Sequence, residues 1–313
     1  MAGNPNYSTD LATTTLEKYA SKVLADNVFT SNALMHTIQK GGNYVPYDGG
    51  VKIVEPVMYA ETSGAGAYSG YDLLSTSASN TSTNAEYNPR SYAVPVVISG
   101  DDKTDNMGEA AVMNMLKNRI MNAEGTIKGL LNAHLYNTAV GGSDGKSLDG
   151  IGIMIDSSGT YGNIDPTSNT WWKATEAAYS SDLVTEATTQ YLAVSKGSTD
   201  KPDLGITTQS VYEKFLQEID PTLRLQSTKL GDVGFEAFKF RGMDVTYDED
   251  CTSQVLYFLN TKYIKLRYHK DRNFMTTEFT SPTNQDADIA HILWKGALTC
   301  SARLRQAKLT GIS

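Results

Sequence analysis

Four histidines and two cysteines are the side chains of this protein best suited to zinc binding or nucleophilic catalysis. The histidines are His36, His134, His269 and His291. No two of them are four residues apart, and Cys251 lies 49 positions before Cys300, so neither type forms a local zinc-binding pattern. The two cysteines fit buried free thiols better than a disulfide framework.

Two clusters of acidic residues carry the oxygen ligands that a hard cation prefers. One cluster consists of Asp101, Asp102 and Asp105, and the other of Asp248, Glu249 and Asp250. Groups of this kind are more often the negatively charged start of a helix or a solvated turn. We therefore expect neither a metal site nor a cofactor.

A glycine-rich segment, residues 141–147, ends with the Gly-Lys-Ser sequence of a phosphate-binding loop. The full motif requires a glycine at the position that Val140 occupies. The flanking pattern is also reversed, because a helical pattern precedes the segment and the strand-like residues 148–151 follow it. Residues 141–145, Gly-Gly-Ser-Asp-Gly, have the spacing of a nucleophile elbow, but an elbow needs the same strand, turn and helix order that is reversed here. The sequence contains no dinucleotide fingerprint. The motifs therefore do not predict an enzyme.

The composition is that of a folded, acidic protein. Of the 313 residues, 40% are hydrophobic and 20% are charged, which is sufficient for a packed core. Basic residues number 27 and acidic residues 35, and the net charge of −8 makes the chain a poor candidate for coating nucleic acid over its whole surface. The longest apolar runs, such as residues 93–98, are too short to span a bilayer, and residues 1–30 have no secretion-signal pattern.

The first 40 residues are predicted to form an arm. A polar tip leads into a helix-compatible stretch over residues 11–39. The apolar side of this stretch consists of Leu16, Tyr19, Val23 and Leu24. Such one-sided spacing is typical of an amphipathic helix. The pattern leaves open whether the arm packs on its own chain or on a neighbour.

A long excursion follows, over residues 41–92. It begins with the strand-like residues 51–59 and continues through residues 62–84, where 15 of 23 residues are Ser, Thr, Gly or Asn. No Lys or Arg occurs in the range 53–89. A stretch of this length without regular structure is unusual inside a compact domain. Two interpretations remain: a surface loop, or a two-stranded arm that reaches over another subunit and buries its apolar residues there.

The strongest helical pattern in the sequence covers residues 104–137, about 50 Å at 1.5 Å per residue. Its apolar stripe consists of Met113, Leu116, Ile120, Ala123, Ile127, Leu130 and His134. Gly125 and Gly129 each cost about 1 kcal/mol relative to alanine, so we expect the helix to need a packing partner. A self-paired coiled coil is the rival interpretation, but the flanks lack the regular charge pattern it requires.

The expected partner of this helix is a long strand near the C-terminus. Apolar or small residues occupy the even positions over 290–304, namely Ala290, Ile292, Trp294, Gly296, Leu298, Cys300, Ala302 and Leu304. This alternation indicates a strand of about 50 Å with one buried face. A second alternating face consists of Tyr92, Val94, Val96 and Ile98, and Pro95 favours an edge position or a bulge there. A long helix on a long narrow sheet makes an elongated platform.

Residues 141–280 have the mixed pattern of a separate α/β unit. Strands are expected at 151–155, 204–208, 238–246, 255–259 and 263–268, and helices at 181–196 and 211–219. Ser210 and Glu213 fit a capping box at the start of the second helix, and Pro221 fits its end. The paired Trp171 and Trp172 are expected to lie in a core or an interface.

The order of these elements resembles that of the tailed-bacteriophage major capsid protein, the Hong-Kong-97-type fold. The resemblance covers nearly the whole chain. Its most telling stretches are Leu148-Asp149-Gly150-Ile151, Trp171-Trp172-Lys173-Ala174, Thr207-Thr208-Gln209-Ser210-Val211-Tyr212, Tyr257-Phe258-Leu259-Asn260, and Trp294-Lys295-Gly296 leading to Arg303-Leu304-Arg305-Gln306. None of them is a chemical motif, so the resemblance depends on their joint order.

The resemblance implies an α+β fold with five parts. These are an N-terminal arm at 1–40, an extended β-hairpin loop at 41–91, a spine helix at 101–139, an α/β axial domain at 141–277, and a peripheral domain with long β-strands formed by 92–140 together with 278–313. The implied function is a structural one, with no cofactor. The chain would self-assemble into the pentamers and hexamers of an icosahedral shell that encloses double-stranded DNA.

The resemblance also implies partners and a location. The main partner is the chain itself, and a portal, scaffolding and decoration proteins are further partners of such a shell. DNA would be contacted weakly and without sequence specificity, and no membrane is involved. The subunit would be assembled in the host cytoplasm and reside in the virion.

Two departures from the family concern how the shell is held together and how it is built. Some relatives crosslink a loop lysine to a neighbouring subunit, and the range 53–89 has no lysine, so we expect no such covalent link. The arm starts near Met1, which suggests a separate scaffold protein or none.

Two sets of residues are predicted to make contacts in such a shell. The expected inter-subunit contacts are Tyr59, Tyr68, Tyr71, Leu73, Leu74, Tyr87, Trp171 and Trp172. The basic residues that could contact DNA or acidic partners are Lys262, Lys265, Arg267, Lys270, Arg303 and Arg305. For this basic set, salt bridges or a solvated face are the alternative to DNA contact.

Two alternative functions remain. An encapsulin-type nanocompartment shell shares the fold and encloses enzymes rather than a genome. A soluble α/β binding protein or enzyme would use the central unit alone.

Overall fold

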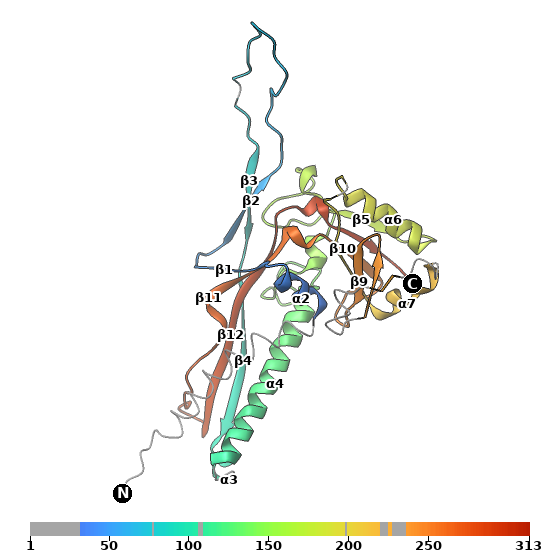
Figure 1. Ribbon diagram of the computed structural model, residues 1–313. Helices are drawn as coiled ribbons and strands as arrows, with labels where there is room; N and C mark the ends of the chain where they lie inside the picture. The colour runs from blue at the N-terminus through green and yellow to red at the C-terminus, as the bar shows by residue number, and fades with distance from the viewer. Residues whose placement is uncertain (1–31, 77, 106–108, 198, 220–224, 227–235) are drawn as a thin grey trace.

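The computed structural model describes residues 32–76, 78–105, 109–197, 199–219, 225–226 and 236–313. Figure 1 shows a long platform, a hairpin that projects beyond one end of it, and a compact unit at its side. Most of the expected N-terminal arm lies outside the described residues. Its described end is helix α2, Ala33–Lys40, where the Asn32 side chain accepts a hydrogen bond from the Met35 N–H at 2.9 Å.

The platform is built on a four-stranded sheet with the order β1-β11-β12-β4. Its strands are β1 (Tyr44–Tyr47), β11 (Ile264–Thr276), β12 (Ala287–Cys300) and β4 (Arg90–Ser99). β4 and β12 run antiparallel, from the pair Arg90 and Gly296 to the pair Ser99 and Ala287. β4 is the edge strand, which confirms the position that Pro95 predicted, because proline has no N–H to donate to a further strand.

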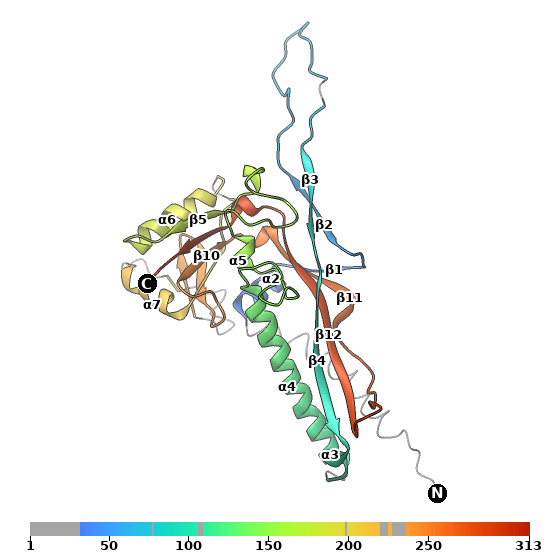
Figure 2. The same ribbon diagram turned by 180° about the vertical axis from the view of Figure 1, so that it is seen from behind.

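A long helix lies along this sheet, as the sequence predicted. Helix α4, Glu109–Leu135, runs beside β4 and follows the short helix α3, Gly100–Asp105 (Figures 1 and 2). Asp101 and Asp102 lie in the first turn of α3, where negative charge suits the helix dipole. Among the described residues, no helix is long and apolar enough to cross a membrane.

The buried stripe of α4 differs from the predicted one toward its C-terminal end. Ile120, Ala123 and Ile127 are buried as predicted. Beyond them the buried residues are Leu131 and Leu135, whereas Leu130 is 38% exposed and His134 is half-buried. The predicted stripe repeats every 3.5 residues on average, and a straight helix has 3.6 residues per turn, so the prediction drifts around the helix. The side chains of Met113 and Leu116 lie outside the described residues.

The long C-terminal strand ends earlier than its alternating pattern predicted. β12 stops at Cys300, and the chain enters a 3-10 helix, Arg303–Arg305. Arg303 is fully buried there and Leu304 is exposed, which reverses the predicted alternation. The cause is the change of surroundings after Gly296: residues 296–300 are buried on both faces where the platform meets the side unit.

The compact unit at the side of the platform, called the side unit below, is a seven-stranded sheet with helices on one face. The strand order is β5-β13-β10-β6-β9-β8-β7. The strands are β5 (Thr175–Ala178), β6 (Leu204–Thr207), β7 (Leu225–Gln226), β8 (Ala237–Phe240), β9 (Met243–Tyr247), β10 (Val255–Leu259) and β13 (Ala307–Thr310). Helices α6 (Leu183–Val194) and α7 (Gln209–Glu218) pack against it over a separate apolar core.

Two predicted strands of the side unit are wrong. Residues 151–155 contain helix α5, Ile151–Met154, because a short, continuously buried apolar run has the same pattern in a helix as in a strand. Residues 238–246 are a hairpin of β8 and β9 that turns at Arg241 and Gly242, with φ of 50° and 88°. These left-handed angles are typical of a tight hairpin turn, but the Arg-Gly pair is not one of its usual sequence signals.

The two helices of the side unit start in different ways. The Asp182 carboxylate accepts hydrogen bonds from the Val184 and Thr185 N–H groups and so caps α6. α7 begins at Gln209, with Thr208 at the cap position, so the predicted capping box of Ser210 with Glu213 is wrong. Pro221 lies outside the described residues.

Sheet membership divides the chain differently from the expected ranges. β11 lies within the expected range 141–277 but belongs to the platform, and β13 lies within 278–313 but belongs to the side unit. β13 inserts between β5 and β10, parallel to the first and antiparallel to the second. Pairing between segments this far apart in sequence leaves no local pattern.

The excursion forms a projecting hairpin, defined here as β2 (Ile53–Met58), β3 (Ser82–Tyr87) and the residues between them. β2 and β3 pair antiparallel, from Ile53 with Tyr87 to Met58 with Ser82, as a separate two-stranded sheet. Both views show the hairpin extending away from the end of the platform that carries α3 (Figures 1 and 2). The two-stranded form of the excursion is therefore confirmed.

Candidate functional site

Among the described residues, no three His, Cys, Asp or Glu side chains come together in a way that could hold a metal ion. Cys251 and Cys300 are both free and buried, as predicted. Burial raises the pKa of the Cys300 thiol to about 12 and also raises the pKa of Cys251, so both thiols stay protonated. Neither thiol is therefore suited to act as a nucleophile or as a metal ligand.

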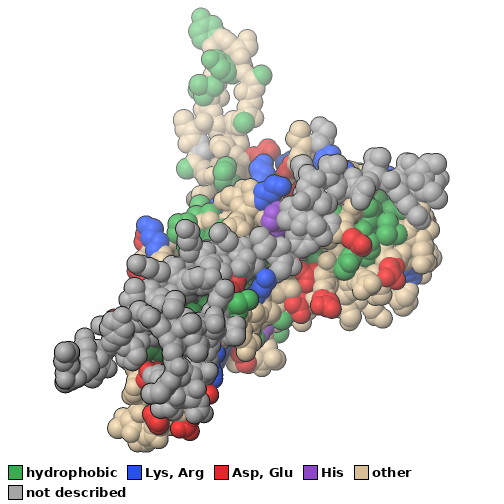
Figure 3. Space-filling view, turned by 60° about the horizontal axis from the view of Figure 1, so that its bottom comes forward, with side chains coloured by type: hydrophobic (Ala, Val, Ile, Leu, Met, Phe, Trp, Pro, Cys, Tyr) green, Lys and Arg blue, Asp and Glu red, His purple; other side chains and the backbone are tan. Residues whose placement is uncertain are grey.

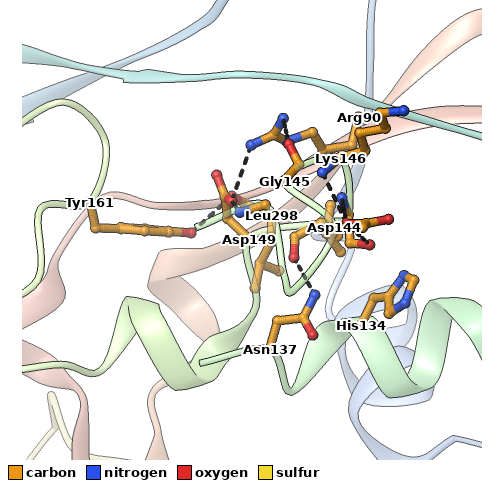
Figure 4. A network of polar contacts seen from close by, with 12 residues as sticks. Arg90, His134, Asn137, Asp144, Gly145, Lys146, Asp149, Tyr161 and Leu298 are labelled. Atoms are coloured by element: carbon orange, nitrogen blue, oxygen red, sulfur yellow. Dashed lines mark hydrogen bonds and ion pairs between the residues drawn. The ribbon is translucent and has the colours of Figure 1, made fainter. Parts of the chain in front are cut away.

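The segment that resembles a phosphate-binding loop uses its N–H groups internally (Figure 4). The N–H groups of Lys146 and Ser147 both donate to the Asp144 carboxylate at 2.9 Å, and the Gly141 N–H donates to Asp149 at 2.6 Å. The hydrogen bond from the Lys146 N–H is the main cause that lowers the pKa of Asp144 to about 2. A bound phosphate would need these same donors, so the segment is a closed turn.

This turn joins the end of α4 to β4. The Tyr92 hydroxyl accepts a hydrogen bond from the Leu148 N–H at 2.7 Å and lies 2.9 Å from His134 Nδ1. The Asn137 amide donates to the Leu148 carbonyl, and the Arg90 guanidinium donates to the Gly145 carbonyl at 3.1 Å (Figure 4). His134 is thus part of a structural network and not a metal ligand.

The end of the projecting hairpin carries the apolar side chains that the sequence predicted as contacts. Tyr68, Tyr71, Leu73 and Leu74 are all exposed, Leu73 to 99%. Figure 3 shows hydrophobic side chains spaced along this hairpin above the body. An exposed apolar group at the end of a projecting element, with no basic residue over 53–89, is typical of a protein-binding surface. The hairpin is the candidate functional site.

The other four predicted contact residues lie at the base of this hairpin. Tyr87 and Trp172 are buried in the chain's own core, so they are not available to a neighbour. The Tyr87 hydroxyl donates to the Cys300 carbonyl at 2.6 Å. Tyr59 stacks on the half-buried Trp171 with ring centres 5.0 Å apart. These aromatic residues make contacts within the chain, between the base of the hairpin and the body, and not with a neighbouring copy.

One residue of the hairpin base, Glu55, was missed by the sequence analysis. It lies on β2 and is buried, and its carboxylate oxygen Oε1 accepts a hydrogen bond from Arg267 Nε at 2.7 Å and lies 2.6 Å from Arg267 Nη2 in an ion pair. Lys265 Nζ lies 3.4 Å from Oε2. The signal was present in the sequence, since Glu55 occupies an inward position of a strand whose other inward residues are Ile53 and Val57.

Most of the predicted basic contacts are engaged inside the chain. Lys265 and Arg267 pair with Glu55, Lys270 with Asp48 at 2.5 Å, and Arg305 with Asp200 at 3.4 Å. Lys262 is exposed, with its ammonium 5.3 Å from the centre of the Tyr263 ring.

Arg303 must be removed from this set, because it is fully buried. Its guanidinium donates to the backbone carbonyls of Met154, Ile153 and Asp156. Four other residues of the set form ion pairs, namely Lys265, Arg267, Lys270 and Arg305. These pairs favour the salt-bridge interpretation over a continuous DNA-binding surface.

No family model matches the chain, and no curated protein matches its sequence. Solved structures do match. A chain of the cyanophage A-1(L) capsid aligns with a TM-score of 0.71 at 14% identity, covering 87% of this chain and 90% of the other. A chain of the native GTA particle capsid aligns with a TM-score of 0.62 at 11% identity, covering 88% and 90%.

An encapsulin is similar as well, at a lower score. A chain of the holo-SrpI encapsulin complex from Synechococcus elongatus aligns with a TM-score of 0.53 at 9% identity, covering 86% of this chain and 84% of the other. Each of these likenesses covers most of both chains. The protein therefore has the α+β fold of the Hong-Kong-97-type capsid proteins.

Proposed function

We propose that this chain is the major capsid protein of a tailed phage or phage-like particle, a structural subunit with no enzymatic role. The observation that carries the proposal is the likeness to the cyanophage A-1(L) capsid chain along 87% of this sequence. The projecting hairpin with its exposed apolar end supports it further, because such an end is best explained by burial against another copy.

Shell formation follows from the shape of the subunit. The platform and hairpin form an elongated body whose two ends differ, so a contact of the hairpin of one copy with the body of the next is heterologous, and such contacts close into rings when the rotation permits. In this fold those rings would be pentamers and hexamers. An interface of standard size buries roughly 1,600 Å². A hairpin that reaches a neighbour adds further contacts, and many modest contacts multiply through multivalency.

We infer a domain assignment that follows sheet membership. The platform, with β4, α3, α4, β11 and β12, corresponds to the peripheral domain, and the seven-stranded side unit, including β13, corresponds to the axial domain. The projecting hairpin corresponds to the extended loop. The exposed members of the predicted contact set, Tyr68, Tyr71, Leu73 and Leu74, are the proposed inter-subunit contacts.

The enclosed DNA would be held weakly. The net charge of −8 per subunit opposes tight binding of a polyanion, and ion pairs occupy most of the predicted basic contacts. Because the range 53–89 has no lysine, the shell would be held by non-covalent contacts of the hairpin. A portal, and scaffolding and decoration proteins, are the further proposed partners in the virion.

Electron microscopy of the purified protein under assembly conditions tests the proposal. We expect closed icosahedral shells. Nucleic acid inside particles purified from the native source would support a capsid, and an enzyme cargo would support the encapsulin alternative, which the SrpI likeness favours as the second candidate. A stable monomer or dimer that never forms cages would instead support a soluble α/β binding protein or enzyme.

A further inference from the structure

Within the described part of the chain, the projecting hairpin has no further strand beside it that could fix its direction. β2 and β3 form a two-stranded sheet of their own, separate from the four-stranded sheet of the platform. A two-stranded hairpin is only marginally stable by itself in water. On the β2 side it is joined to β1 through Gly49 and Gly50, with φ of 149° and 117°, which are angles that glycine adopts freely. On the β3 side it continues into β4 after only Asn88 and Pro89, and the Glu86 N–H donates to the Gly162 carbonyl at 2.9 Å. Side-chain contacts at the base add to these two backbone connections in setting the direction of the hairpin.

Glu55 lies at the centre of the base. The inward face of the hairpin consists of Ile53, Glu55 and Val57 on β2, with Ala85 and Tyr87 on β3. The Glu55 side chain is only 5% exposed, and it is the one charged residue on this face. Its two cationic partners, Arg267 and Lys265, both come from β11 of the platform. The ion pairs thus connect two separate sheets.

A buried charge at this position is not required for stability alone. An apolar residue of similar volume often stabilises a protein as well as a buried ion pair does, because the charges lose their hydration. An apolar contact, however, tolerates sliding, whereas the planar Arg267 guanidinium donates from Nε to Glu55 Oε1 at 2.7 Å and holds Nη2 2.6 Å from the same oxygen. The pair therefore specifies an angle as well as a contact.

We propose that the ion triad of Glu55, Arg267 and Lys265 sets the direction of the projecting hairpin in the unassembled chain. The hairpin then meets its neighbour already oriented, and assembly does not have to order it. Fixing a binding element beforehand lowers the entropic cost of association. The role in assembly rests on the proposed capsid function, but the orientation itself is a property of the single chain and can be measured there.

A spin-label distance measurement tests the orientation directly. Labels attached to Ala67→Cys at the hairpin end and Asn122→Cys on α4 report the distance between hairpin and platform, since both positions are exposed and the native cysteines are buried. The measurement uses the full chain at a concentration where it sediments as a monomer. We expect Glu55→Gln, which keeps the shape and removes the charge, to broaden the distance distribution roughly twofold.

Glu86→Gln is the matched control. Glu86 lies on β3 of the same hairpin and pairs with Lys52 at 2.6 Å, but both side chains are substantially exposed, so its loss should leave the distribution unchanged. If Glu55→Gln does not fold, Arg267→Lys keeps the positive charge and removes the planar two-donor geometry, and we expect an intermediate broadening. The proposal would be overturned if Glu55→Gln and Arg267→Lys both gave the same label-to-label distance distribution as the parent chain.

A second readout addresses assembly. In light-scattering assays we expect Glu55→Gln to slow shell formation by about tenfold and Glu86→Gln by less than about twofold. A broadened distribution with an unchanged assembly rate would remove the role in assembly and leave the orientation role. If the parent chain forms no shells at all, the capsid function fails, whereas the distance measurement on the single chain still decides the orientation.

Discussion

At the scale of single residues, the aromatic side chains of the excursion divide into two groups that their types alone do not separate. Tyr71 is fully exposed and Tyr87 is buried against β12. Both are tyrosines in a polar stretch, and only the pairing of Ile53 with Tyr87 turns one of them inward. Residue type therefore predicted that contacts would form here, but not whether they would form within the chain or between chains.

Tyr87→Phe should destabilise the single chain. The hydroxyl of Tyr87 donates to the Cys300 carbonyl at 2.6 Å and accepts from the Cys300 N–H at 3.3 Å, and both groups are buried. Removing it leaves a buried carbonyl without this donor, which costs about 1–3 kcal/mol in free energy of unfolding. Urea denaturation measures this cost. The control Tyr71→Phe should change nothing, and a Tyr87→Phe chain as stable as the control would contradict the prediction.

The turn around Asp144 should keep its structure in mild acid. The pKa of Asp144 is lowered to about 2, mainly by the Lys146 N–H, so the carboxylate stays charged in the folded chain well below its ordinary range. A group with a lowered pKa stabilises the fold above its unfolded pKa and loses this effect as the pH falls through the folded one. The loss is therefore confined to the window between about pH 4 and pH 2.

Hydrogen exchange of the Ser147 amide, corrected for its intrinsic rate, checks this window. Protection should be constant from pH 7 to about pH 4. Asp144→Ala should lower the protection between pH 4 and pH 7, where the parent carboxylate is charged. Loss of protection in the parent chain already at pH 5 would show that the carboxylate is not held as described.

At the scale of elements, the periodicity of the sequence predicted which helices and strands exist better than it predicted where they end and which of their residues are buried. A long helix on a long sheet was predicted from alternation and from a 3–4 spacing, and α4 confirms it. Its main neighbour is β4, however, and not the C-terminal strand β12 that was expected as its partner. The prediction was wrong at Leu130 on α4, where the predicted repeat had drifted around the helix, and after Gly296 on β12, where the surroundings change along the strand. Helix α5 was missed because four buried residues are too few to show a period.

Ile120→Asp should unfold the platform. Ile120 is 2% exposed on the face of α4 that packs against β4, and an unpaired buried carboxylate costs several kcal/mol. The neighbouring Met121 is 56% exposed, so Met121→Asp places the same charge one residue away in water and serves as the control. Circular dichroism and solubility distinguish them. A soluble, native-like Ile120→Asp chain would mean that this face of α4 is not packed.

At the scale of the whole molecule, the family resemblance rested on element order, and the fold was correctly inferred from it. The expected domain ranges, however, differ from the division of the chain between the two sheets. β11 belongs to the platform and β13 to the side unit, contrary to the expected ranges. Both placements depend on strand pairs between distant parts of the chain, such as Leu309 with Leu256, which no local pattern reports.

Deletion of residues 64–80 should separate folding from assembly. This segment lies beyond β2 and β3, and its apolar residues Tyr68, Tyr71, Leu73 and Leu74 are exposed, so the core loses nothing. We expect a monomer with unchanged thermal stability that forms no shells in electron microscopy, because the contacts to the neighbour are gone. Normal particles from the shortened chain would contradict the role of the hairpin in joining subunits.

The position of β13 has a consequence for synthesis of the protein. β5 is translated well before β13, yet β13 is its only neighbour in the sheet among the described residues. β13 also completes the pairing of β10. Neither strand can be fully paired until residues 307–310 have left the ribosome. Translation products that stop short of these residues would expose unpaired strand edges and be open to proteolysis. The sheet of the side unit would thus be complete only after residues 307–310 have been translated.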